Sequence, residues 1–113
     1  MSTFDQDRLC TEARKAAANA YAPYSKFRVG AALLCTDGTI ITGVNVENRS
    51  YGLTICAERA AICTAISSGF HEFSAMAITG LDIESPLPPC GACRQVLTEF
   101  LPADASIYFC GFN

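Results

Sequence analysis

Residues 27–46, FRVGAALLCTDGTIITGVNV, carry the clearest structural signal in the chain. Two stretches rich in apolar residues, 27–35 and 39–46, flank Thr36-Asp37-Gly38. An Asp-Gly turn between two apolar runs is typical of a β-hairpin. The sequence therefore predicts two antiparallel strands joined by a tight turn.

Helices and strands are predicted on both sides of this hairpin. Apolar residues at helical spacing predict a helix over 5–20, and an alanine-rich helix over 56–68 that Gly69 can end. Residues 73–80 are almost all apolar, as in a strand buried on both faces. The remaining predictions are a proline-rich loop, a helix and a last strand, at 81–89, 90–101 and 105–110.

This order of elements predicts an α/β fold with three α/β/α layers around a mixed central sheet. The 113 residues are enough for a single domain over 1–113. Charged residues make up 17% of the chain, against roughly 25% in an average soluble domain. So low a charge on a small protein predicts that other subunits cover part of its surface.

The charge balance and the apolar runs exclude two classes of partner. The chain has 8 Lys+Arg against 11 Asp+Glu, a net charge of −3. A polynucleotide-binding protein normally carries excess positive charge on one face, so a nucleic acid is disfavoured as the main partner. No stretch approaches the roughly 18 consecutive apolar residues of a membrane helix, so no membrane partner is expected.

The cysteines indicate a cytosolic protein with a metal or catalytic site. There are 7 of them, an odd number, so they cannot all be paired in disulfides. The N-terminus is acidic and lacks the apolar core of a secretory signal. We therefore expect reduced thiols, and clustered cysteines in that setting more often bind metal than crosslink. Four cysteines in apolar segments are expected to be core residues: Cys10, Cys35, Cys63 and Cys110.

The other three, Cys56, Cys90 and Cys93, lie where two predicted helices begin. Helix N-termini favour thiolates, and the Cys-x-x-Cys spacing puts two thiols on one side of a helical turn. Two such helix ends meeting at one point would bind zinc with one position open, as in catalytic sites. Glu58 is close enough to meet an acidic water at that position, and Arg59 could offset the charge of three thiolates.

Other interpretations of these residues stay open at this point. His71 could close a structural zinc site in an inert subunit, although its place at a helix-to-strand turn favours an exposed side chain. Cys90 and Cys93 could form a redox pair. Glu58 considered alone would be a solvated acid that favours the helix dipole.

Several motifs occur together in this chain. They are CAERAA at 56–61, PCGAC at 89–93, PYSKFRVGAA at 23–32, GVNVEN at 43–48, and Tyr51-Gly52. The combination resembles the small, homotetrameric, zinc-dependent cytidine deaminases in their three-cysteine form, over about residues 6–110. The resemblance implies the three-layer fold of that family.

The resemblance also implies a reaction. Cys56, Cys90 and Cys93 would bind Zn²⁺, with water or hydroxide as the fourth ligand. Hydroxide would attack C4 of cytidine or 2′-deoxycytidine, and ammonia would leave to give the uracil nucleoside, a step of pyrimidine salvage. Glu58 would take the proton of the water, deliver it to N3 and later protonate the leaving amine. A related aminonucleoside or a free base is the alternative substrate.

A set of substrate contacts follows from the same resemblance. Phe27 would stack on the base, and Asn45 and Glu47 would hydrogen-bond the ribose 3′-hydroxyl. The backbone around Ala57 and Pro89 would contact the edge of the base. Two residues would reach the pocket of a neighbouring subunit in a homotetramer with shared active sites: Arg49 and Tyr51.

Judged by position alone, these contact residues have ordinary explanations. Phe27 at the start of a strand would be a core residue. Asn45 and Glu47 alternate along a strand end and can point to one side, which would otherwise be a solvated face.

The family usually continues past the last strand with a Leu-Leu-Pro segment and a phenylalanine that covers the active site of another subunit. This sequence ends at Phe112-Asn113, a difference that bears on the tetramer more than on the zinc site.

Overall fold

The computed structural model describes residues 3–24, 26–50, 55–80, 101 and 106–110. Within these residues a mixed sheet has the strand order β2-β1-β3-β4. Its strands are β1 (Val29–Cys35), β2 (Ile40–Val44), β3 (Phe73–Gly80) and β4 (Ser106–Cys110). Strand β1 is antiparallel to β2 and β3, whereas β3 and β4 are parallel. The predicted helix over 90–101 lies outside the described residues, apart from Leu101.

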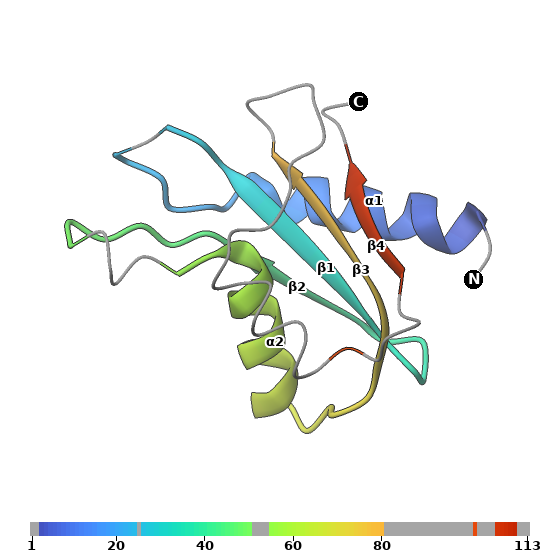
Figure 1. Ribbon diagram of the computed structural model, residues 1–113. Coiled ribbons are helices and arrows are strands. Elements are labelled where there is room, and N and C mark those ends of the chain that lie inside the picture. The colour runs from blue at the N-terminus through green and yellow to red at the C-terminus, as the bar shows by residue number, and fades with distance from the viewer. Residues whose placement is uncertain (1–2, 25, 51–54, 81–100, 102–105, 111–113) are drawn as a thin grey trace.

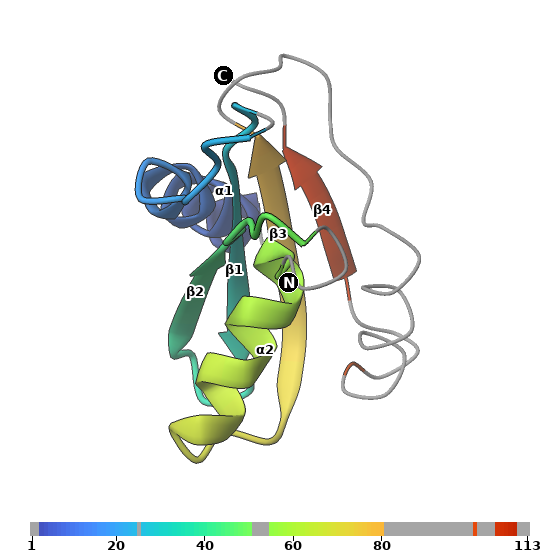
Figure 2. The same cartoon turned by 90° about the vertical axis from the view of Figure 1, so that its left-hand side faces the viewer.

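The two helices lie on opposite faces of the sheet. Helix α1 (Thr3–Ala17) packs behind the sheet as it is drawn in Figure 1, and helix α2 (Ala57–Ser67) packs in front of it. Figure 2 shows the same three layers from the side. The predicted three-layer α/β fold with a mixed sheet is confirmed.

The hairpin formed by β1 and β2 is confirmed, with pairs from Gly30↔Val44 to Leu34↔Ile40. Its turn places Gly38 at a φ of +96°, a conformation that suits glycine. The Thr39 N–H donates to the Asp37 carboxylate at 3.0 Å, which holds the pKa of Asp37 below its ordinary value. Both strands are shorter than predicted, because the chain leaves the sheet before Val29 and after Val44.

Alternate side chains of β1 enter two separate cores. Ala31 and Leu33 pack with residues of α2, whereas Ala32 packs with residues of α1. Strand β3 is buried along nearly its whole length, as predicted for a strand covered on both faces. Gly69, at a φ of +94°, follows the end of α2, and this predicted helix stop is also confirmed.

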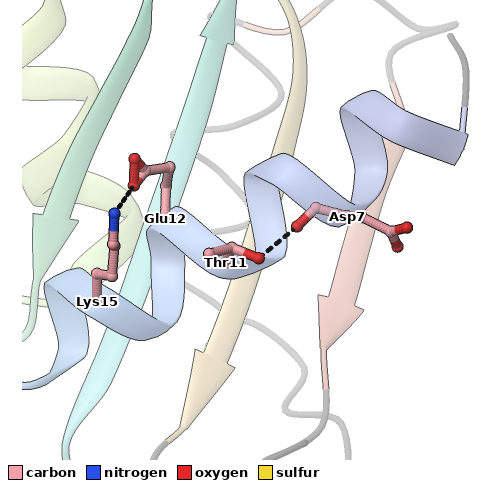
Figure 3. Close-up of polar contacts among 4 residues, drawn as sticks. All are labelled: Asp7, Thr11, Glu12 and Lys15. Carbon is pink, nitrogen blue, oxygen red and sulfur yellow. Dashed lines mark hydrogen bonds and ion pairs between the residues drawn. The ribbon is translucent and has the colours of Figure 1, made fainter.

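The side of α1 that faces away from the sheet is polar (Figure 3). The Thr11 hydroxyl donates to the backbone carbonyl of Asp7 at 2.9 Å, and the Lys15 ammonium lies 3.6 Å from the Glu12 carboxylate. Both interactions are exposed, so they add little to stability. No helix in the described part of the chain is long and apolar enough to cross a membrane.

Two glycines bring the helices close to the sheet. A Cβ atom on Gly30 would meet the backbone of α1, at Ala13 O and, 2.8 Å away, at Ala17 N. A Cβ atom on Gly43 would meet the backbone of α2, at Ala61 N and, 2.7 Å away, at Ala57 O. Each helix therefore rests on a strand at a position where no side chain other than hydrogen fits.

The expectation that Cys10 and Cys110 are reduced core residues is wrong. Their sulfurs form a disulfide that joins α1 to β4, with the Cα atoms 6.0 Å apart. Both residues are buried, as expected, in the core between α1 and the sheet. The two cysteines are 100 positions apart, so only the packing of the last strand against the first helix brings them together.

The disulfide should stabilise the fold measurably. A crosslink that closes so long a loop constrains the unfolded chain, and removing it typically costs about 2 kcal/mol or more. We expect Cys10→Ser to lower the free energy of unfolding in urea by about that amount. Cys63→Ser is the control, because Cys63 is exposed and free. An unchanged urea midpoint for Cys10→Ser without reductant would contradict the prediction.

The other two predicted core cysteines have different outcomes. Cys35 is buried, as expected, and burial raises the pKa of its thiol, with a further contribution from the charge of Asp37. Cys63 is exposed, so the prediction that it belongs to the core is wrong. The buried face of α2 runs through Ala57, Ala61 and Ala65, and a residue two positions after Ala61 falls on the opposite side.

Candidate functional site

The first residues of α2 carry the centre of the candidate site. Cys56 is the N-cap residue, with extended backbone, and its side chain makes no capping hydrogen bond. Cys56 is half-buried and belongs to no disulfide. Cys56 lies at a helix N-terminus, as predicted, and such a position favours the thiolate. The other two predicted ligands, Cys90 and Cys93, lie outside the described residues.

The Arg59 side chain lies against this sulfur. Its Nη2 atom donates to Cys56 Sγ at 3.8 Å, from one helical turn further along α2. A guanidinium that donates to sulfur stabilises the thiolate and reduces its negative charge. A thiolate is the form in which cysteine binds zinc, so the chemistry of Cys56 fits that metal.

Glu58 points into the protein rather than into solvent. Only 4% of the residue is exposed, although it lies in the first turn of a helix where acids are usually solvated. Taking a carboxylate out of water is costly, so a buried one is typical of a functional site. The interpretation of Glu58 as a solvated acid is therefore wrong.

Two polar side chains just beyond the end of β2 hold the segment that carries Phe27. Asn45 Oδ1 accepts the Val29 N–H at 2.9 Å, and Asn45 Nδ2 donates to the Phe27 carbonyl at 2.9 Å. Glu47 Oε1 accepts the Tyr24 N–H at 3.0 Å. Both side chains therefore point to one side, as expected. Asn45 is 9% exposed, so it is not part of a solvated face.

The remaining predicted contact residues differ in exposure. Phe27 is half-buried, so it is more exposed than a core residue. Ala57 is buried, and Arg49 is exposed. Two further residues of this set, Tyr51 and Pro89, lie outside the described part of the chain.

His71 is placed where it cannot close a zinc site at Cys56. It is exposed, as predicted, and it follows the end of α2 that is opposite to Cys56. A helix of 11 residues spans roughly 16 Å, far beyond the length of a metal–ligand bond. The structure therefore stands against an inert zinc module that uses His71. The alternative of a redox pair, Cys90 with Cys93, falls outside the described residues.

Two features of the site could not be predicted from the sequence. Lys26, directly before Phe27, has a φ of 62°, in the left-handed region that residues other than glycine rarely adopt. The hydrogen bonds from Asn45 to the backbone were also missed. Their partners are 16 and 18 positions away, and no local pattern links an asparagine to carbonyl and amide groups at such a distance.

Residues 4–110 match the family model described as "Cytidine and deoxycytidylate deaminase zinc-binding region". A cytidine deaminase of Halalkalibacterium halodurans is 53% identical over 104 residues, which are 92% of this chain and 78% of that protein. One from Mycobacterium tuberculosis is 52% identical over 99 residues, 88% of this chain and 74% of that protein.

Solved structures show the same similarity. The crystal structure of cytidine deaminase from Mycobacterium tuberculosis superposes with a TM-score of 0.86 at 50% identity, covering 91% of this chain and 83% of the other. The one from Burkholderia pseudomallei gives a TM-score of 0.79 at 48% identity, covering 88% of this chain and 77% of the other.

Proposed function

Because the chain belongs to the cytidine and deoxycytidylate deaminase family, we propose that it hydrolyses cytidine and 2′-deoxycytidine to uridine and 2′-deoxyuridine. The reaction releases ammonia and belongs to pyrimidine salvage. The observation that carries this proposal is the buried carboxylate of Glu58, in the first turn of α2 and two residues after Cys56.

The metal of this site is proposed to be zinc, held by Cys56 together with Cys90 and Cys93. When bound, zinc supplies the Lewis acid that lowers the pKa of a water molecule. Three thiolates carry more negative charge than the ion balances. The hydrogen bond from Arg59 to Cys56 Sγ reduces this excess, and we propose that this is the function of Arg59.

Glu58 is proposed to move the protons of the reaction. Its carboxylate accepts a proton from the attacking water, whose oxygen forms a bond to C4, and delivers this proton to N3 of the pyrimidine. It then transfers a second proton, from the new C4 hydroxyl, to the exocyclic nitrogen. The C4–N bond breaks and ammonia leaves, so the carboxylate ends in the state in which it began.

The substrate is proposed to lie between the start of α2 and the segment that carries Phe27. The ring of Phe27 stacks on the base, and the backbone at Ala57 and Pro89 contacts the base edge. Asn45 and Glu47 hydrogen-bond the ribose 3′-hydroxyl. Since a site built for a hydroxyl rejects substrates that lack it, free cytosine should be a poor substrate.

We also propose a homotetramer with shared active sites. Four exposed large apolar residues of the described part form an exposed apolar patch: Tyr21, Tyr24, Val46 and Ile55. Backbone bridges join three of them in a row, Tyr21 to Val46 and Val46 to Ile55. If a second copy of the chain covered this patch, Arg49 and Tyr51 of one subunit would reach the active site of the other. Sedimentation should then give about four times the mass of one chain.

The reaction itself is tested with purified protein loaded with zinc. We expect the near-ultraviolet absorbance of cytidine to fall as uridine forms, and ammonia to appear in equal amount. The protein should leave cytosine nearly unchanged over the same time. If zinc is bound at one ion per chain and neither cytidine nor 2′-deoxycytidine is consumed, the proposed function is wrong.

A further inference from the structure

We propose that Asn45 positions Phe27 against the base, in addition to meeting the ribose. Its side-chain amide holds the backbone at Phe27 and Val29, and so determines the position of the aromatic ring of Phe27. This inference rests on the proposed function, because the base is the group that the ring would contact.

The hydrogen bonds of Asn45 leave its amide a single orientation. Its oxygen faces the Val29 N–H and its nitrogen faces the Phe27 carbonyl, each at 2.9 Å. Turned by 180°, the amide would set nitrogen against N–H and oxygen against carbonyl oxygen, and both bonds would be lost. Asn45 is only 9% exposed, so water competes little with its side chain for these two part-buried bonds.

The segment before Val29 needs such a support. Phe27 lies outside β1, so its backbone carbonyl is not held by the ladder of the sheet. Lys26 has a φ of 62°, and a lysine stays in this unfavourable conformation only where its surroundings enforce it. Within the described residues, the Lys26 N–H donates to Ala22 O at 3.0 Å on one side of this residue, and the Asn45 amide holds the other side.

Binding the ribose and holding Phe27 are compatible in one side chain. An amide nitrogen carries two N–H groups, and the bond to the Phe27 carbonyl uses one of them. The second can donate to a substrate hydroxyl. Base stacking and ribose binding would therefore share a single residue, and removing it should weaken both.

The test uses 2′,3′-dideoxycytidine, which lacks the hydroxyl that Asn45 would bind. We expect Asn45→Ala to raise the KM for this analogue about tenfold, the size of effect that a displaced stacking ring gives. A variant that merely folds poorly has fewer active molecules, which lowers the apparent kcat and leaves KM unchanged. If Asn45 acted on the hydroxyl alone, the KM of Asn45→Ala for the analogue would stay within about twofold of the KM of the parent.

Asn45→Asp separates the two hydrogen bonds. Aspartate can still accept from Val29 and from a ribose hydroxyl, but it sets an oxygen against the Phe27 carbonyl. We expect it to raise KM for the analogue as Asn45→Ala does. Asn19→Asp makes the same change at an exposed residue, and it should leave KM unchanged. An Asn45→Asp protein that binds the analogue as tightly as the parent would overturn the proposal.

A double-mutant cycle shows whether Asn45 acts through Phe27. In a Phe27→Ala background the ring is gone, so adding Asn45→Ala should change KM for the analogue by less than about twofold. A second tenfold rise there would mean that Asn45 acts by another route.

The activity of the parent protein distinguishes failure of the proposed function from failure of this inference. If it does not deaminate cytidine, the proposed function fails. If the parent deaminates cytidine and Asn45→Ala has the same KM for the analogue as the parent, this inference alone fails.

Discussion

Glu58→Gln should lower kcat for cytidine roughly 10³-fold while the protein stays folded and keeps its zinc. Glutamine has nearly the shape of glutamate, so it can occupy the same buried place at the start of α2. It cannot accept the proton of the attacking water, nor deliver one to N3. Because Glu58 is not proposed as a ligand, zinc per chain should equal that of the parent.

The control for this substitution is Glu72→Gln. Glu72 is exposed and lies beyond the opposite end of α2, so its variant should have the kcat of the parent. Activity, zinc content and thermal midpoint should be measured on all three proteins. The proposed role of Glu58 would be wrong if its variant kept more than about a tenth of the parent kcat. Loss of zinc from the variant would instead make Glu58 a ligand.

Much of the fold could be predicted because its signals are local. The Asp-Gly turn at 37–38, the apolar run at 73–80 and the glycine after α2 each depend on neighbours in sequence, and the structure contains all three features. The ends of strands were less predictable. Residues 27–28 and 45–46 each pair an apolar with a polar side chain, as a strand can. In the structure, however, the Phe27 carbonyl accepts from the Asn45 side chain, the Asn45 carbonyl accepts from the Tyr21 N–H, and Val46 pairs with Ile55.

Features that depend on distant segments could not be predicted. Cys10 and Cys110 looked like two more small core residues, since nothing in a sequence tells which strand will lie beside which helix. The exposure of Cys63 depended on which face of α2 the sheet covers. The polar residues of the site were found through their motifs, whereas the bonds that Asn45 makes appear only in three dimensions.

Gly43 links the stability of the fold to the chemistry of the site. It lies on β2 opposite Ala31, and α2 crosses it so closely that hydrogen is the only substituent with room. The atoms in the way belong to the backbone of Ala57 and Ala61, the former being next to both Cys56 and Glu58. A change at Gly43 therefore pushes on the turn of helix that carries the proposed metal ligand and proton carrier.

We expect Gly43→Ala to lower the free energy of unfolding by about 3 kcal/mol, the upper part of the range for overpacking, since backbone cannot turn aside as a side chain can. If the protein folds, α2 must have moved away from β2. A displacement of about 1 Å at a catalytic group can cost 10²-fold in rate, so kcat/KM for cytidine should fall by roughly that factor.

Two other glycines separate the causes of these losses. Gly38→Ala meets no atom within 4 Å, but its φ of +96° is unfavourable for alanine, so it should cost about 1 kcal/mol and leave kcat unchanged. Gly30→Ala presses on α1 instead of α2, so it should destabilise the fold about as much as Gly43→Ala while its folded molecules retain more of the parent kcat. Urea denaturation measures the free energy of unfolding, and assays below the unfolding midpoint measure kcat.

If Gly43→Ala cost no more stability than Gly38→Ala, the close contact between β2 and α2 would not be what places Glu58. Equal losses of kcat in Gly30→Ala and Gly43→Ala would mean that general loosening, rather than movement of α2, disables the site.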